Sequence, residues 1–163
     1  FEDAAMSLEE AARIKRESID ARVAKLTEIV AGDPDNHYIF WHDLEDERRA
    51  IQRAIPDAAS VYGSLDLDIR ERRIVDFSDG RTKYLSTKPS ISGSGCNFQR
   101  HCHKAVFVGI DYKFNDFIQS VHRINRFLQT EPCETTSSTR KPSVRSCACS
   151  KRSGTSTNGC WRK

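Results

Sequence analysis

The sequence has no run of apolar residues close to the roughly 20 that a helix needs to cross a bilayer. A secretory signal is not visible either, because the first residues are acidic and favour a helix. These absences exclude a membrane-spanning protein and favour a cytoplasmic location. Internal repeats are also missing, which excludes a repeat array. The first residue is Phe1 rather than Met, so we expect the chain to be part of a longer protein.

Two signatures of nucleotide hydrolysis are missing as well. The chain has no Walker A loop, in which a glycine-rich turn ends in Gly-Lys-Ser or Gly-Lys-Thr, and it has no Asp-Glu-x-x box. We therefore expect that this chain does not hydrolyse ATP by itself.

Acidic residues are absent from Thr135 to the last residue, where seven of the 26 Lys and Arg residues lie. The same stretch holds twelve Ser and Thr among 29 residues and almost nothing to bury. This composition predicts a disordered basic tail over residues 135–163. Residues 1–134 then carry 19 basic against 23 acidic side chains, so the formal net charge of +3 is a poor argument for nucleic-acid binding.

A shifted reading frame is a second interpretation of this tail. With freely chosen synonymous codons, translation from the third base of the Thr135 codon gives a strand-like start followed by an amphipathic helix. Such a segment suits an α/β domain better than the tail as given. A nucleotide sequence that allows no such alternative would exclude the shift.

Six cysteines without a secretory signal indicate reduced thiols. Cys96, His101, Cys102 and His103 lie close together in the sequence, but their spacing matches none of the usual zinc-ligand pairs. In an extended segment His101 and His103 would also point to opposite sides. We predict no metal site, and we interpret this segment as a structural loop that brings His103 near a phosphate.

Short apolar stretches alternate with stretches of helical periodicity along most of the chain. The pattern predicts strands over residues 37–42, 59–62, 83–86 and 105–110, and helices over residues 7–30, 45–55, 68–77 and 119–129. This order indicates an α/β fold, a parallel sheet with helices on both faces. The chain divides into an N-terminal helix and turn (1–36), an α/β lobe (37–134) and the tail (135–163).

Ligands of parallel sheets lie at the carboxyl ends of the strands. We expect that edge to hold the loops that follow Trp41, Tyr62, Ser86 and Ile110. Four acidic residues come just after the first strand, and we interpret them as a helix N-terminus stabilised by the helix dipole rather than as a catalytic pair: Asp43, Glu45, Asp46 and Glu47.

The predicted helix from Gln119 to Gln129 organises the lobe. An apolar stripe at helical spacing is formed by Phe117, Val121, Ile124 and Leu128. Gln119, Arg123 and Arg126 share another face. Two arginines one turn apart repel each other unless an anion lies near them, and guanidinium groups match phosphate oxygens in charge and geometry. On the two arginines alone, a solvated basic face is the simpler interpretation.

A glycine-rich segment, Gly93-Ser94-Gly95-Cys96-Asn97, lies between two predicted strands. Glycines let a backbone come close to a phosphate. Taken alone, the segment is better explained as a tight turn.

Four segments in this order resemble the second RecA-like lobe of superfamily 2 helicases, especially those of Swi/Snf type. In chain order they are Tyr38-Ile39-Phe40-Trp41, Tyr62-Gly63-Ser64 with Arg70-Glu71-Arg72, Gly93 to Phe98, and the set Gln119, Arg123, Arg126 and Gln129. The last set resembles the family's motif Gln-x-x-x-Arg-x-x-Arg-x-x-Gln. The resemblance covers roughly residues 8–132. Phage and mobile-element helicases, some associated with DNA methylases, look similar through the run Cys-Asn-Phe-Gln-Arg-His-Cys-His at residues 96–103.

The chain departs from the Swi/Snf pattern in three places. Ser86-Thr87 lies further from Asn97, the step from Asn115 to Gln119 is shorter, and Leu128 stands where those enzymes have glycine. These departures bear on the subfamily rather than on the superfamily.

The resemblance implies roles for individual residues. ATP and Mg²⁺ would be bound by a first lobe that is missing from this chain. Arg123 and Arg126 would be arginine fingers that stabilise charge on that ATP, and Gln119 would orient them. Three residues would couple the nucleotide state to the nucleic acid: Gly93, Gly95 and Asn97. Three others would approach the phosphates of the DNA backbone: Gly63, Ser64 and Thr87.

The resemblance therefore implies the C-terminal motor lobe of an ATP-dependent DNA helicase or translocase, working with a first lobe and, in the mobile-element case, with a DNA methylase. DNA is preferred over RNA because the arginine motif has the Swi/Snf form, without the glycine that DEAD-box proteins place between the arginines. A second hypothesis is an orphan, non-catalytic module for nucleic-acid binding or docking, left by truncation of a helicase gene. A third is a zinc-binding regulatory domain, which a metal-free purified chain would exclude.

Overall fold

The structure is a computed structural model that describes residues 8–92, 96–109, 114–125, 129–138 and 145–147. Its centre is a six-stranded sheet with the strand order β2-β3-β1-β4-β5-β6. The strands are β1 (His37–Trp41), β2 (Ala59–Val61), β3 (Tyr84–Thr87), β4 (Cys102–Phe107), β5 (Cys133–Ser137) and β6 (Arg145–Cys147). The first five run parallel, and β6 pairs with β5 in the antiparallel direction.

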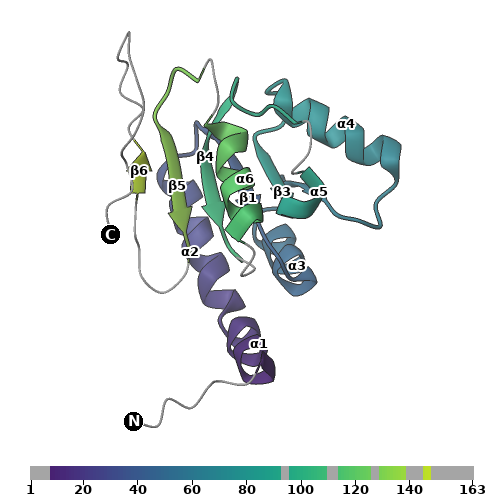
Figure 1. Cartoon of the computed structure of the whole chain (residues 1–163), viewed down its shortest axis with the longest axis vertical. Coiled ribbons are helices and arrows are strands. Elements are labelled where there is room, and N and C mark those ends of the chain that lie inside the picture. The colour runs from purple at the N-terminus through teal and green to yellow at the C-terminus, as the bar shows by residue number, and fades with distance from the viewer. Residues whose placement is uncertain (1–7, 93–95, 110–113, 126–128, 139–144, 148–163) are drawn as a thin grey trace.

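Helices cover both faces of this sheet (Figure 1). The described helices are α1 (Leu8–Glu17), α2 (Ile19–Gly32), α3 (Glu45–Ala54), α4 (Leu67–Ser78), α5 (Pro89–Ser92) and α6 (Phe114–Ile124), of which α1 extends beyond the sheet from the start of α2. One core cluster packs α2 and α3 against Tyr38, Phe40 and Val106. The other packs Phe77 of α4 and Ile124 of α6 against the opposite face of the same strands. The predicted α/β sheet with helices on both faces is confirmed.

The central strands explain why the sequence folds in this way. Residues 38–41 in β1 and 105–107 in β4 are almost fully buried. A parallel strand with helices on both of its faces buries successive side chains on opposite sides, so it needs a continuous apolar run. Each large apolar side chain that leaves water contributes about 1.5–3 kcal/mol to folding.

The helix predicted over residues 7–30 is interrupted at Ser18, where α1 ends and α2 begins. The Ser18 hydroxyl donates to the carbonyl of Lys15 at 3.0 Å and accepts a hydrogen bond from Nε of Arg22 at 3.1 Å. Serine side chains compete for backbone partners in this way, which favours helix ends over helix interiors. Periodicity alone does not detect such a break.

Two further elements, α6 and β4, differ clearly from the prediction in where they begin and end. The helix expected over residues 119–129 begins five residues earlier, at Phe114, and ends at Ile124. Strand β4 begins at Cys102 rather than at residue 105, because its polar first half pairs with β1 across an irregularity: Cys102 lies opposite His37, and Lys104 opposite Tyr38.

The tail predicted to be disordered contributes to the sheet. Residues 133–137 form β5, which pairs with β4 in register from Lys104↔Glu134 to Phe107↔Ser137. The backbone ladder, the β-branched threonines and an ion pair between Lys104 and Glu134 hold a strand that has little apolar surface. The division at residue 134 therefore cuts through a strand, and the rest of the predicted tail, apart from Ser138 and β6, lies outside the described residues.

Candidate nucleotide and nucleic-acid interface

The loop after β2 presents an open backbone at the carboxyl edge of the sheet. Gly63 and Ser64 are both exposed, and a Cβ placed on Gly63 would meet no atom within 4 Å. The next strand along this edge, β3, ends at Thr87. The predicted DNA-contacting residues Gly63, Ser64 and Thr87 therefore share one edge.

Thr87, however, is fully buried. Its hydroxyl forms a 2.7 Å hydrogen bond with the hydroxyl of Ser92, the last residue of α5. A phosphate could reach this hydroxyl only if α5 moved away. The contact between Thr87 and DNA stays a prediction, and the open part of the edge is the loop at Gly63.

Arg48 of α3 adds a cation to the same edge, which the sequence analysis did not identify. Its guanidinium carbon lies 4.4 Å from the centre of the Tyr62 ring, just before Gly63. Arg48 is also paired with Glu45 at 2.5 Å. This ion pair raises the pKa of Arg48, and a charge partly neutralised by Glu45 supplies only a modest attraction for an anion.

Arg123 lies on α6, on the face of the sheet covered by α4 and α5. Its guanidinium donates to the carbonyl of Cys96 at 3.5 Å, and its buried Nε has no hydrogen-bond partner among the residues that the structure describes. Gln119, one turn earlier, is exposed. Within the part of the chain that the structure describes, no hydrogen bond joins Gln119 to Arg123, so the predicted orienting contact stays a prediction.

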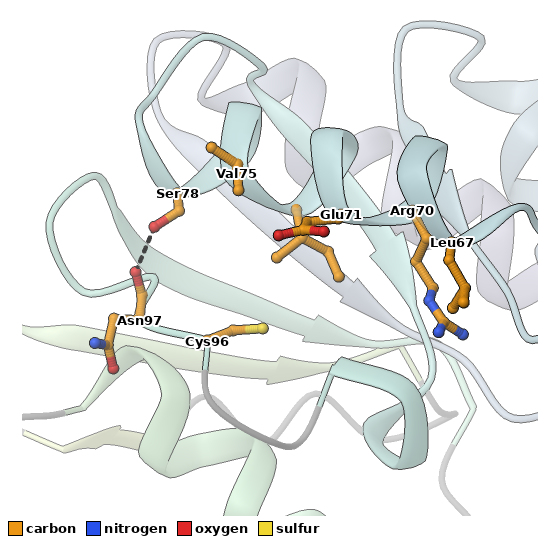
Figure 2. A pocket seen from close by; sticks show the side chains of 8 residues that line it. Leu67, Arg70, Glu71, Val75, Ser78, Cys96 and Asn97 are labelled. Carbon is orange, nitrogen blue, oxygen red and sulfur yellow. Dashed lines mark hydrogen bonds between the residues drawn. The ribbon is translucent and has the colours of Figure 1, made fainter.

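Asn97 follows Cys96 and lies beside α4. Its backbone carbonyl accepts a 2.8 Å hydrogen bond from the Ser78 hydroxyl at the end of α4 (Figure 2). Between α4 and this segment is an open groove of about 640 Å³ with Leu67, Ile74 and Val75 on its α4 side. Burial raises the pKa of the Cys96 thiol at this groove, although Arg123 opposes the shift, so the thiol stays protonated at neutral pH.

His103 lies at the other edge of the sheet from Gly63 and Ser64. It belongs to the amino-terminal half of β4, beside the pairing of Tyr38 with Lys104. The structure therefore does not bring His103 together with the other predicted DNA-contacting residues. The reason is the early start of β4, which turns the expected loop into a strand.

Some predicted residues cannot be placed. Gly93, Gly95 and Arg126 lie outside the described residues. Among the described residues, no group of three or more His, Cys, Asp or Glu side chains could hold a metal ion. The same part of the chain contains no helix that is long and apolar enough to cross a bilayer.

A buried ion pair joins α2 to α3, and its further hydrogen bonds reach the loops after β1 and β4. The Arg22 guanidinium lies 2.6 Å from Oε1 of Glu47 and also donates to the carbonyl of Val108. Oε2 of Glu47 accepts hydrogen bonds from the backbone N–H groups of Asp43 at 2.9 Å and Leu44 at 3.0 Å. The acidic group after the first strand does begin a helix, as predicted, and Glu47 in its first turn is completely buried.

His42, directly after β1, is fully buried, and neither of its ring nitrogens has a hydrogen-bond partner in the described ranges of the chain. Burial, assisted by Lys88, lowers the pKa of His42 from 6.5 to about 4. As the pH falls from 6.5 towards 4, His42 therefore becomes protonated in the unfolded chain while it stays neutral in the folded chain. The contribution of neutral His42 to the free energy of unfolding is fully present above pH 6.5. It falls as the pH is lowered through this window, by up to about 3 kcal/mol in total.

We expect this decline to be visible between pH 7 and pH 5 in urea unfolding curves. At pH 5 the His42 contribution alone should lower the free energy of unfolding by about 2 kcal/mol. His42→Leu, which has no titrating group, should show a correspondingly smaller difference between the two pH values. Equal differences in the two proteins would show that His42 is not the group responsible.

Comparison with known proteins identifies the fold. No protein-family model matches the chain, and neither does any curated protein sequence. Among solved structures, the C-terminal part of the Fun30 ATPase domain superposes with a TM-score of 0.62 at 14% identity. The C-terminal domain of the DEAD-box protein Dbp5 superposes with a TM-score of 0.55 at 19% identity. The chain has the RecA-like fold of a helicase C-terminal domain.

The lobe accounts for only part of these structures. The matches cover 71% of this chain but 39% of the Fun30 chain, and 66% of this chain but 64% of the Dbp5 domain. Saccharomyces cerevisiae Dbp5 bound to RNA and ADP BeF3 superposes with a TM-score of 0.56 at 20% identity, over 71% of this chain and 31% of that one. At identities this low, the superpositions establish the fold of the lobe but not its activity. The activity has to be inferred from the residues of the chain.

Proposed function

We propose that this chain is the C-terminal motor lobe of an ATP-dependent DNA helicase or translocase. The observation that carries the proposal is the place of Arg123. On a lobe with this fold, Arg123 extends from α6 to the carbonyl of Cys96 in the glycine-rich segment, and its buried Nε has no partner within the described part of the chain. A guanidinium group in that position is suited to a phosphate presented by a second lobe.

In this proposal the first lobe holds ATP and Mg²⁺, and this lobe completes the site. Arg123 and Arg126 would stabilise the charge that develops on the transferred phosphoryl group, and Gln119 would orient them. The segment containing Gly93, Gly95 and Asn97 would pass the nucleotide state on to the nucleic acid. Its contacts with Arg123 through Cys96, and with α4 through Ser78, support such coupling.

The carboxyl edge at Gly63 and Ser64 is the proposed path of the DNA backbone. DNA is proposed over RNA because the spacing Gln119, Arg123, Arg126, Gln129 has the Swi/Snf form, although Dbp5 was solved with RNA. A phage or mobile-element origin, and with it a DNA methylase partner, rests on the run at residues 96–103.

Gly63 offers a direct test of this path. Because the space around it is open, Gly63→Asp should fold normally but place a negative charge near the DNA backbone. Two like charges about 4 Å apart in water repel by ~1 kcal/mol, so the Kd for duplex DNA should rise about fivefold in low salt. Fluorescence anisotropy with labelled duplex DNA measures this change.

Gly63→Ala is the matched control and should bind like the wild type. Equal affinities of the aspartate and alanine variants would remove Gly63 from the DNA path. Tighter binding of an RNA duplex than of a DNA duplex of the same sequence would replace DNA by RNA in the proposal.

A further inference from the structure

The side chain of Gln129 bonds to three separate parts of the backbone. Its Nε2 donates to the carbonyl of Ile124 at 3.0 Å and to the carbonyl of Cys102 at 3.3 Å. Its Oε1 accepts a hydrogen bond from the backbone N–H of Glu131 at 3.2 Å. One carboxamide therefore joins the end of α6, the start of β4 and the chain that leads into β5.

The two carbonyls lie at the ends of regular elements, one at the end of α6 and one at the start of β4. Ile124 is the last residue of α6, and the final carbonyls of a helix have no partner within it. Cys102 is the first residue of β4 and pairs with His37, next to the irregularity at which His103 is skipped in the pairing with β1. An amide has two N–H donors and one acceptor oxygen, which is the set required here.

These bonds act next to Arg123, because Ile124 directly follows Arg123 at the end of α6. The contacts with Cys102 and Glu131 join that helix end to β4 and to the segment that leads into β5. The Cys133 thiol, from β5, also donates to the Ile124 carbonyl at 3.4 Å. We propose that Gln129 is a positioning residue, which holds the end of α6 against β4 and so keeps Arg123, one residue before Ile124, in place to face ATP. Its catalytic consequence rests on the function proposed above.

Hydrogen exchange on the full chain tests the positioning role independently of any activity. In Gln129→Ala, amide exchange in peptides covering residues 124–131 should rise about tenfold, because both hydrogen bonds to backbone carbonyls and the acceptor for the Glu131 N–H are lost. Gln129→Glu keeps only the acceptor and turns an anion toward two carbonyls, so its increase should be at least as large. If the alanine variant fails to fold, Gln129→Asn, shorter by one CH₂, should give a smaller but local increase.

Gln52 provides a matched control on another helix. Its Nε2 donates to the carbonyl of Pro56 at 3.0 Å, beyond the end of α3. Gln52→Ala should raise exchange only near residues 55–57 and leave residues 124–131 unchanged. Unchanged exchange at residues 124–131 in Gln129→Ala, or an equal rise over the whole chain, would overturn the proposal.

The catalytic consequence is measured in a protein that joins this lobe to an ATP-binding first lobe. Gln129→Ala should lower kcat about tenfold while the KM for ATP stays within about twofold, since the residue acts through the arginines rather than on bound ATP. A local rise in exchange with unchanged kcat would overturn the positioning role. If the wild-type protein hydrolyses no ATP, the proposed function fails, and the exchange result decides separately whether Gln129 holds the end of α6.

Discussion

Arg123→Ala should lower the kcat for ATP hydrolysis about a thousandfold or more in a protein that joins this lobe to its ATP-binding lobe. The reason is that the guanidinium group meets charge that develops only in the transition state. The KM for ATP should change little, because the first lobe supplies most of the binding contacts. Steady-state kinetics with saturating nucleic acid measure both constants.

Two further variants make this result specific. Arg123→Lys keeps the positive charge but loses the planar fork, so it should recover only part of the activity. Arg53→Ala, an exposed arginine in the last turn of α3, should retain full activity. An Arg123→Ala protein with unchanged kcat would remove this residue from the ATP site.

Glu47→Ala should lower the free energy of unfolding by about 3–5 kcal/mol. The change leaves the buried Arg22 guanidinium without its carboxylate and removes the acceptor for two backbone N–H groups at the start of α3. Burial alone would raise the pKa of Glu47, but the N–H groups of Asp43 and Leu44 and the charge of Arg22 outweigh it, so the carboxylate stays ionised. Urea unfolding at pH 7 measures the loss.

An exposed carboxylate of the same helix turn is the control. Glu45→Ala breaks only surface pairs with Arg48 and Arg49 and should cost about 0–1 kcal/mol. The double variant Arg22→Met, Glu47→Leu should cost less than the sum of the single changes at the two positions, because neither charge is left alone. A loss for Glu47→Ala no larger than that for Glu45→Ala would contradict the buried pair.

Gly109 adds a steric consequence of the same pair. A Cβ on Gly109 would lie 1.9 Å from Oε2 of Glu47, so the carboxylate fills the space that a side chain would need. The loop after β4 thus carries glycine at this position because Glu47 packs directly on its backbone.

The sequence predicted the parts of the fold that rest on apolar patterning. The continuous apolar runs of β1 and β4 and the stripe of Phe117, Val121 and Ile124 on α6 pack where alternation and helical spacing placed them. Strand β5 escaped prediction because Glu134 to Ser137 are polar. That strand is held by the β4 ladder, which composition does not reveal.

The candidate site was predictable only where family motifs marked it. Gly63 and Ser64 share an edge as predicted, and Arg123 lies beside the glycine-rich segment. Contacts between residues far apart in the sequence could not be predicted. Arg22 and Glu47 are 25 residues apart, and each looks like a solvated helix residue in the sequence. The hydrogen bonds of the Gln129 side chain depend on the start of β4 and the end of α6, which only the folded chain brings together.

The most direct test of the motor proposal is the rate of ATP hydrolysis by this lobe joined to a lobe with a Walker A loop and an acidic magnesium box, measured with and without duplex DNA. We expect hydrolysis to require both lobes and to rise when DNA is added. Hydrolysis that is the same without this lobe would contradict the proposal. The proposal would also be contradicted if the gene encodes no such first lobe and the chain binds DNA without using ATP. That result would identify an orphan binding module.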